Sequence, residues 1–86
     1  MDTVIITLTN TNNSFLLDLE VPVDVTVEKL KEDLYEALNI YNPELYIRPA
    51  SAFELYCKRL GVYLIRESTL RQEGVWNGDI IFMTEV

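Results

Sequence analysis

Gly74-Val75-Trp76-Asn77-Gly78-Asp79, followed at once by Ile80-Ile81-Phe82-Met83, is the stretch that decides the fold. Asn-Gly is a strong turn dipeptide, because both residues accept a positive φ at little cost. The apolar run after this turn predicts a strand over residues 79–84. Ser68-Thr69-Leu70, a few residues earlier, predicts another small turn. The last quarter of the sequence is therefore a pair of turns that lead into a final strand.

The N-terminal part of the sequence predicts a β-hairpin. Residues 3–9 are rich in the β-branched side chains that strands favour, and the polar cluster at residues 10–14 suits a turn. Over residues 15–21, the apolar Leu17, Leu19 and Val21 alternate with acidic residues, which predicts a second strand. Pro22 cannot donate a backbone hydrogen bond and should end this strand.

A single amphipathic helix should follow the hairpin. Thr26 is a good N-cap, because its hydroxyl can accept a hydrogen bond from a free backbone N–H, and Glu28 suits the positive end of the helix dipole. The pattern predicts a helix to about Asn39. Its apolar stripe consists of Val27, Leu30, Leu34, Ala37 and Leu38.

Two short strands are predicted between the helix and the final turn. Residues 53–58 alternate between apolar and more polar side chains, which predicts a third strand, and Gly61 permits a turn into a short fourth strand over residues 62–64. An irregular connection with Pro43 and Pro49 precedes them. The predicted order is β-β-α-β-β-β, in one domain of class α+β that spans residues 1–86.

Composition narrows the functions open to this chain. With 86 residues, 49% of them hydrophobic, it can fill one core without a disulfide or a structural metal. The formal charge is −7 and the 7 basic residues are scattered, which argues against nucleic acid as a partner. The first residues do not predict a signal peptide, and no apolar run approaches the roughly 18 residues of a membrane span. We therefore expect a soluble, cytoplasmic protein that does not insert into the membrane.

The sequence predicts no catalytic residue, no metal site and no cofactor. It contains no histidine and one cysteine, so the common zinc ligand sets cannot be assembled and the thiol has no histidine as a base. Cys57 is in phase with the apolar Phe53 and Leu55, which predicts an inert core residue. We therefore expect that the protein is not an enzyme.

A row of acidic residues along the helix is the remaining candidate for chemistry. Glu28, Glu32 and Glu36 recur every four residues, and paired carboxylates can act as acid and base or bind a cation. Lys29 and Lys31 are interleaved with them and lie off the apolar stripe. A solvated helix face is therefore the favoured interpretation.

Taken together, the hairpin, the Thr-started helix, the Gly61 turn, Thr69-Leu70 and the position of Val75 resemble ubiquitin over nearly the whole chain. The turn at residues 74–79 and the small, acidic, single-cysteine chain most resemble the YukD/EsaB group, small cytoplasmic proteins of the type VII secretion systems of Gram-positive bacteria. The resemblance implies a ubiquitin-like β-grasp fold, a mixed sheet with one helix packed on one face. It also implies an accessory that supports or regulates secretion of WXG-type substrates by contacting membrane-embedded machinery.

Two residues qualify this resemblance. Lys58 falls where ubiquitin has the central isoleucine of its receptor-binding patch, and a cation there should repel standard ubiquitin receptors. Trp76 sits beside a tight turn and is either a lid over the core or an exposed binding anchor. Of these two interpretations of Trp76 we favour the lid.

The sheet face turned away from the helix is the predicted protein-binding site. If Ile81 and Met83 face the helix, the alternate residues of the last strand face outward. In a β-grasp sheet the first, last and third strands are neighbours, so an apolar patch would form there beside a lysine. The opposite register of the last strand, which is apolar at every position, would abolish this patch. The predicted site residues are Ile5, Tyr56, Lys58, Ile80 and Phe82, and the partner is the secretion machinery or a second copy of the chain.

Other functions of the scaffold remain as alternatives. A β-grasp carrier, such as a sulfur carrier, needs a C-terminal diglycine for activation, and Thr84-Glu85-Val86 does not supply one. We therefore expect a protein that is not conjugated. A regulatory ubiquitin-like adaptor unrelated to secretion is a further alternative, and its nucleic-acid-binding form is disfavoured by the net charge.

Overall fold

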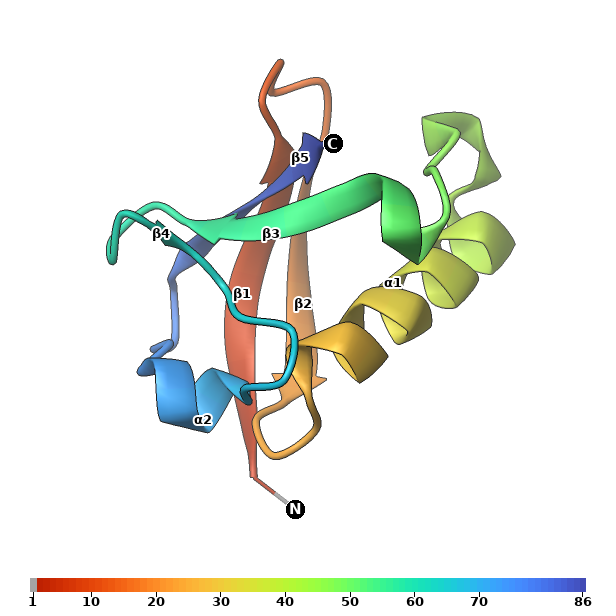
Figure 1. Cartoon of the computed structure of the whole chain (residues 1–86). Helices are drawn as coiled ribbons and strands as arrows, with labels where there is room; N and C mark the ends of the chain where they lie inside the picture. Colours follow the sequence, from red (N-terminus) through yellow and green to blue (C-terminus); the bar gives the residue numbers. More distant parts are fainter. Residues whose placement is uncertain (1) are drawn as a thin grey trace.

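A computed structural model describes residues 2–86 and shows one five-stranded sheet with a long helix across one face (Figure 1). The strands lie in the order β2-β1-β5-β3-β4; β1 and β5 are parallel and the other neighbours antiparallel. This is the predicted α+β architecture. In chain order the elements are β1 (Thr3–Asn10), β2 (Leu16–Pro22), α1 (Val27–Tyr41), η1 (Pro43–Leu45), η2 (Ala50–Ala52), β3 (Phe53–Cys57), β4 (Val62–Tyr63), α2 (Leu70–Glu73) and β5 (Ile80–Glu85).

Local sequence accounts for the hairpin and the start of the helix. In the turn between β1 and β2, Asn13 has a φ of 52° and the backbone N–H of Ser14 donates to the Asn10 side chain at 2.9 Å. Thr26 is the N-cap of α1 as predicted, since its hydroxyl accepts from the N–H of Lys29 at 3.2 Å. The helix runs two residues past the predicted end.

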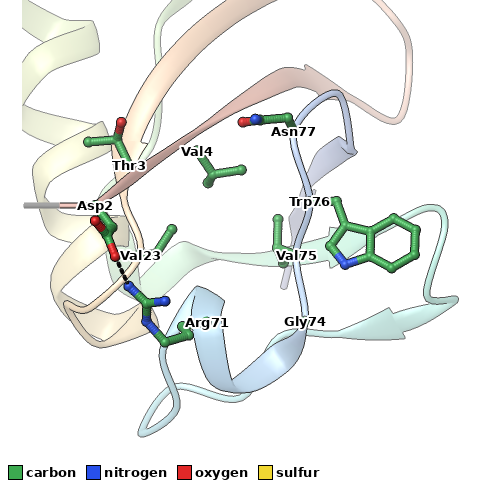
Figure 2. Close-up of a pocket in the computed structure, with 9 residues that line it drawn as sticks. All are labelled: Asp2, Thr3, Val4, Val23, Arg71, Gly74, Val75, Trp76 and Asn77. Carbon is green, nitrogen blue, oxygen red and sulfur yellow. Dashed lines mark hydrogen bonds and ion pairs between the residues drawn. The ribbon is translucent and has the colours of Figure 1, made fainter.

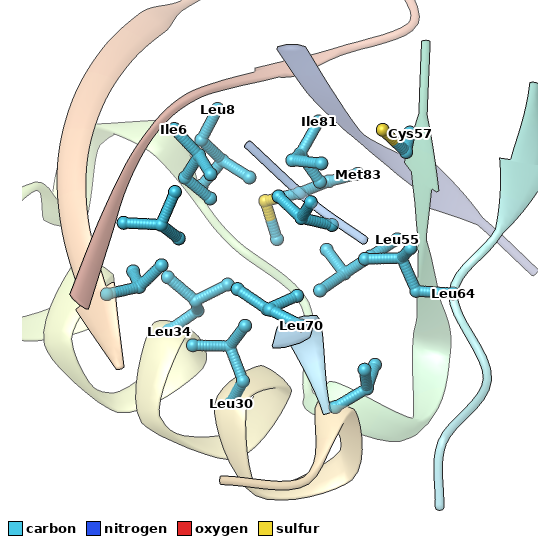
Figure 3. Close-up of a cluster of buried hydrophobic side chains, with 14 of the residues drawn as sticks. Ile6, Leu8, Leu30, Leu34, Leu55, Cys57, Leu64, Leu70, Ile81 and Met83 are labelled. Carbon is cyan, nitrogen blue, oxygen red and sulfur yellow. The ribbon is translucent and has the colours of Figure 1, made fainter. Parts of the chain in front are cut away.

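The core lies between the sheet and α1 (Figure 3). The even-numbered apolar residues of β1, the odd-numbered residues of β3, and Ile81 and Met83 of β5 are buried, which confirms that Ile81 and Met83 face inward. Cys57 is fully buried among them, as predicted for a core residue. The fully buried side chains are Ile6, Leu8, Val27, Leu55, Cys57, Leu70 and Ile81.

Two details of the sequence interpretation are wrong on α1. The predicted apolar stripe includes Ala37, which is exposed. The predicted solvated face includes Lys31, yet only 4% of its side chain is exposed. Its ammonium lies 3.3 Å from a carboxylate oxygen of Glu54 and 5.5 Å from the ring centre of Phe53, so partners on β3 make its burial tolerable.

The predicted small turn at Thr69-Leu70 is a short helix, α2. Thr69 and Gln72 form a reciprocal capping box, in which each side chain bonds the backbone N–H of the other residue. Gly74 ends the helix with a φ of 79°, a conformation that costs a glycine little. Leu70 of this helix is buried, and the helix leads directly into the final turn.

Candidate protein-binding face

The face of the sheet opposite α1 brings the predicted site residues together. Tyr56 on β3 is directly opposite Phe82 on β5, and Ile80 is two residues before Phe82 on the same face. Lys58 donates its backbone N–H to the carbonyl of Ile80 at 3.0 Å, so it adjoins the same strand. We call the surface formed by the half-buried Tyr56, Ile80 and Phe82 and the exposed Ile5, Lys58 and Tyr63 the outer face.

Ile5 lies at the margin of this surface rather than at its centre. The carbonyl of Ile5 accepts from the backbone N–H of Gly78 at 2.8 Å, so Ile5 lies beside the turn that precedes β5. The residue of β1 that pairs with Ile80 is Thr7. The side chain of Ile5 is 51% exposed. It extends the apolar surface toward the turn, but the densest part lies across β5, β3 and β4.

Three aromatic side chains form that densest part. The rings of Tyr56 and Tyr63 pack edge to face with centres 5.1 Å apart, and the rings of Tyr56 and Phe82 are 6.4 Å apart. Together with Thr11 and Thr84 they line an open depression of about 310 Å³. Tyr63 was not among the predicted site residues. The antiparallel turn at Gly61 could have indicated it, because that turn places β4 beside Tyr56.

The turn at residues 76–79 is held rigid beside the outer face. The carboxylate of Asp79 accepts from Arg59 Nε at 2.7 Å, from Arg59 Nη2 at 2.9 Å and from the N–H of Trp76 at 2.8 Å. The Arg59 hydrogen bonds, followed by that of Trp76, hold the pKa of Asp79 below its usual range although burial opposes this. Asp79 is therefore an ionised, buried anchor for the turn.

Trp76 is not a lid over the core, so the favoured interpretation of this residue is wrong. Its side chain is 63% exposed, and Figure 2 shows the indole pointing away from Val4 and Val75. The buried position is taken by Val75. The guanidinium carbon of Arg59 lies 3.8 Å from the centre of the indole, so the arginine covers one face of the ring and fixes its direction.

A wide hollow near the N-terminal end of β1 is mostly polar (Figure 2). Arg71 donates to Asp2 at 2.6 Å and to Asp24 at 2.7 Å, and these hydrogen bonds raise the pKa of Arg71 further above its usual value. The three side chains are more than half exposed. This cluster ties α2 to the start of β1 and to the segment before α1, and we assign it a structural role.

The structure assembles no evident chemical centre in the part of the chain that it describes. Within residues 2–86 no three His, Cys, Asp or Glu side chains are grouped in a way that could hold a metal ion. The Cys57 thiol is buried and 3.9 Å from an acceptor oxygen of Asp79. Glu28, Glu32 and Glu36 are all exposed, as the solvated-face interpretation predicts. Among the described helices, none is long and apolar enough to cross a membrane.

The fold is shared with ubiquitin-like domains of solved structure. The ubiquitin-like domain of Plasmodium falciparum Dsk2 is 19% identical with a TM-score of 0.75, and the alignment covers 99% of this chain and 100% of that one. Caldiarchaeum subterraneum ubiquitin is 21% identical with a TM-score of 0.75, over 99% of this chain and 95% of that one. These similarities confirm the ubiquitin-like fold.

The same fold occurs in the ubiquitin-like domain of EccD5 and in a chain of an ESX-5 inner membrane complex. The ubiquitin-like domain of EccD5 from Mycobacterium xenopi is 14% identical with a TM-score of 0.76, and the alignment covers 100% of this chain and 97% of that one. A chain of the MycP5-free ESX-5 inner membrane complex is 16% identical with a TM-score of 0.75, over 100% of this chain and 21% of that one. At these identities the similarity establishes the fold alone.

Family membership comes from the sequence. No curated protein sequence matches the chain. The model of the family described as "WXG100 protein secretion system (Wss), protein YukD" matches residues 3–83. This range contains both α-helices, the strands β1 to β4 and the first part of β5. The chain therefore belongs to the YukD family of ubiquitin-like, secretion-associated proteins.

Proposed function

We propose that this protein is a cytoplasmic accessory of a type VII secretion system in a Gram-positive bacterium. It acts by binding a protein component of the membrane-embedded machinery, without conjugation and without catalysis of its own. Membership of the YukD family supports the link to secretion of WXG-type substrates. The presence of a similar fold within an ESX-5 inner membrane complex supports the machinery as the partner.

The aromatic outer face is the observation that supports this proposal most directly. Small sheets that are covered on one side generally carry polar residues on the other. Here Tyr56 packs against both Tyr63 and Phe82 on the uncovered side, with Lys58 at the margin. Aromatic side chains are enriched at binding hot spots, because each buries a large area at a low entropic cost. A contiguous patch of this kind is typical of a protein contact.

The test is a substitution that removes the patch and preserves the core. Phe82→Ser should reduce capture of the detergent-solubilised secretion complex at least tenfold, since loss of a hot-spot side chain costs about 2 kcal/mol or more. Because Phe82 is only partly buried, the thermal unfolding midpoint should remain nearly unchanged. The variant should also fail to restore secretion of WXG-type substrates in a strain that lacks the gene.

A matched control comes from the opposite side of the molecule. Tyr35→Ser also removes a partly buried aromatic ring, but from α1, and should bind and complement as the wild type does. Normal capture and secretion with Phe82→Ser would contradict the outer face as the binding site. Normal secretion in the strain without the gene would contradict the proposed function itself.

A further inference from the structure

We propose that the edge of β2 and the groove between β2 and α1 form a second binding site, distinct from the outer face. Its occupant is an extended peptide segment in which Lys or Arg alternates with apolar residues. The segment adds to the sheet as a sixth strand beside β2. Three independent properties of this edge lead to the proposal: free hydrogen-bonding groups, an apolar groove and a fixed pattern of acidic side chains.

The first property is an open sheet edge. Within residues 2–86 β2 pairs with β1 alone, and it is the first strand in the sheet order (Figure 1). Ile5 and Thr7 direct their backbone groups toward the turn before β5, in bonds of 2.8 to 2.9 Å. In an antiparallel pair, facing residues either bond each other or both point away. The residues opposite them, Glu20 and Asp18, therefore direct their N–H and C=O groups away from β1.

The second property is an apolar groove on the inner side of this edge. The groove has a volume of about 430 Å³ and lies between β2 and α1. Leu19 and Val21 form its wall on the strand, and Leu34, Leu38 and Tyr41 are among the residues that form it on the helix. A strand that pairs with β2 would point every second side chain into this groove, because side chains alternate across a strand. Those side chains must be apolar.

The third property is the charge of the opposite side. The side chains of Asp18 and Glu20 are exposed on the outward side of β2, held by hydrogen bonds from the hydroxyls of Thr7 at 2.7 Å and Thr3 at 2.6 Å. Residues directly opposite them on an added strand share that side, and opposite charges there are favourable. The incoming strand must therefore place a basic residue opposite each acidic one.

The same charges disfavour a second copy of this chain as the occupant. If two β2 edges paired, each acidic side chain of one copy would lie close to the acidic side chains of the other, which is destabilising. Pro22 also lacks an N–H at the end of the strand, and such features are how proteins protect an edge from self-pairing. Pairing of β2 with a second copy of β2 is thus unfavourable, whereas pairing with a basic strand is favourable.

The experiment uses a short synthetic peptide as the probe. The peptide Lys-Val-Arg-Ile-Lys-Leu, capped at both ends, has the required alternation. A peptide of the same composition in blocks, Lys-Arg-Lys-Val-Ile-Leu, is its control, and Glu-Val-Glu-Ile-Glu-Leu reverses the charge. NMR titration of the full chain should show saturable shifts with the alternating peptide alone, and slower amide hydrogen exchange at Asp18 and Glu20. The amides of Leu17 and Leu19, already bonded to β1, should change little.

Variants separate the charge pattern from overall charge. Asp18→Lys with Glu20→Lys should weaken the alternating peptide about tenfold or more, because two favourable cross-strand pairs become repulsive. Glu28→Lys with Glu32→Lys makes the same change in net charge on the exposed side of α1 and should have a much smaller effect. Ala37→Trp, at an exposed position in the groove, should block binding, whereas Asn39→Trp should not.

Several results would overturn the proposal. Absence of saturable binding by the alternating peptide would do so, as would equal binding of the block peptide or equal losses in the two charge-reversed variants. Concentration-dependent shifts at Asp18 and Glu20 without peptide would show that a second copy occupies the edge. None of these results bears on the outer face, because Phe82→Ser leaves β2 and α1 untouched and should bind the peptide normally.

Discussion

Asp79 is the residue on which the shape of the final turn depends. It is 6% exposed, yet it accepts hydrogen bonds from the side chain of Arg59 and from the N–H of Trp76. Arg59 in turn lies on the Trp76 ring and donates to the carbonyl of Gly74 at 2.6 Å. One buried carboxylate thus fixes the direction of the most exposed large aromatic side chain near the outer face.

The lowered pKa of Asp79 makes a pH-dependent prediction. An aspartate in an unfolded chain titrates near about 3.9. Because the Arg59 hydrogen bonds lower the pKa in the folded state, their stabilisation is fully present above that value and is lost as the pH falls through the folded pKa. Asp79→Asn should therefore cost about 1–3 kcal/mol of unfolding free energy at pH 7. The difference from wild type should shrink toward pH 3.

Urea unfolding at pH 7 and pH 3 measures this difference. Asp33→Asn is the matched control, since Asp33 forms an exposed ion pair with Lys29 at 3.0 Å and such pairs contribute little. It should change stability by less than about 1 kcal/mol at either pH. A loss in Asp79→Asn that stays constant between the two pH values would show that ionisation of the carboxylate is not what stabilises the turn.

Lys31 and Glu54 should respond very differently to substitution. Lys31→Met keeps the volume of the buried side chain and removes a desolvated charge, so it should be neutral or stabilising. Glu54→Ala leaves the Lys31 ammonium buried without its carboxylate, and should cost about 3 kcal/mol. Thermal and urea unfolding of the two variants would compare them. Equal losses would mean that the ion pair itself is the main source of stability.

Among single residues, the sequence could identify those whose environment is local. Thr26 was predicted as a cap and Cys57 as a core residue, because the neighbours along the chain decide both. Trp76 and Lys31 were misassigned, because their surroundings depend on Arg59 and Glu54, 17 and 23 residues away. No periodicity along the chain contains that information.

At the scale of elements, α1 is the part of the fold that most directly tests the core. Leu34 lies on its buried face and is 5% exposed, and Figure 3 shows it close to Leu30 within the core cluster. Leu34→Ala should cost about 2–5 kcal/mol, from lost transfer free energy and from the cavity that remains. Ala37→Ser, three residues further along the helix and exposed, is the control and should cost less than about 1 kcal/mol. A urea midpoint that moves equally in both variants would contradict this packing.

The strands were easier to predict than the connections between them. Alternation in β2 and β3 predicts which side chains face the core, and the structure confirms it, with Leu17 and Leu19 partly buried. In β5 every residue from Ile80 to Met83 is apolar, so its register depends on the parallel pairing with β1 and could not come from β5 itself. The helix α2 has four residues, too few for a periodic pattern, and it is recognisable in the sequence only by its caps.

At the scale of the whole molecule, the basic and acidic side chains are distributed unevenly over the surface. Within residues 2–86, ion pairs involve Lys29, Lys31, Arg59, Arg66 and Arg71, each with a neighbouring carboxylate. Lys58 is outside these pairs and lies at the margin of the outer face. The excess of acidic residues is spread over the hairpin, the helix and the edge of β2. On the outer face, Ile5 is directly opposite Glu20 whereas Lys58 adjoins Ile80, so one margin of this face is acidic and the other is basic.

This charge imbalance predicts how salt should affect stability. With 14 acidic and 7 basic residues, the folded chain carries a net charge of −7 at pH 7 and repels itself. Raising NaCl from about 0.01 M to about 1 M shortens the Debye length from about 30 Å to about 3 Å, which screens that repulsion. The thermal midpoint at pH 7 should therefore rise by about 5 °C, which corresponds to roughly 1 kcal/mol for a domain of this size.

The sign of the salt effect should change with pH. Near the isoelectric point of about 4.3 the net charge is close to zero, and attractive pairs outweigh repulsion between like charges. The same salt then screens mainly attraction, so the midpoint should stay constant or fall. Calorimetric scans at the two pH values and two salt concentrations measure both effects. An equal rise at both pH values would show that salt acts through hydrophobic burial and not through charge, because only the charge effect depends on the ionisation of the carboxylates.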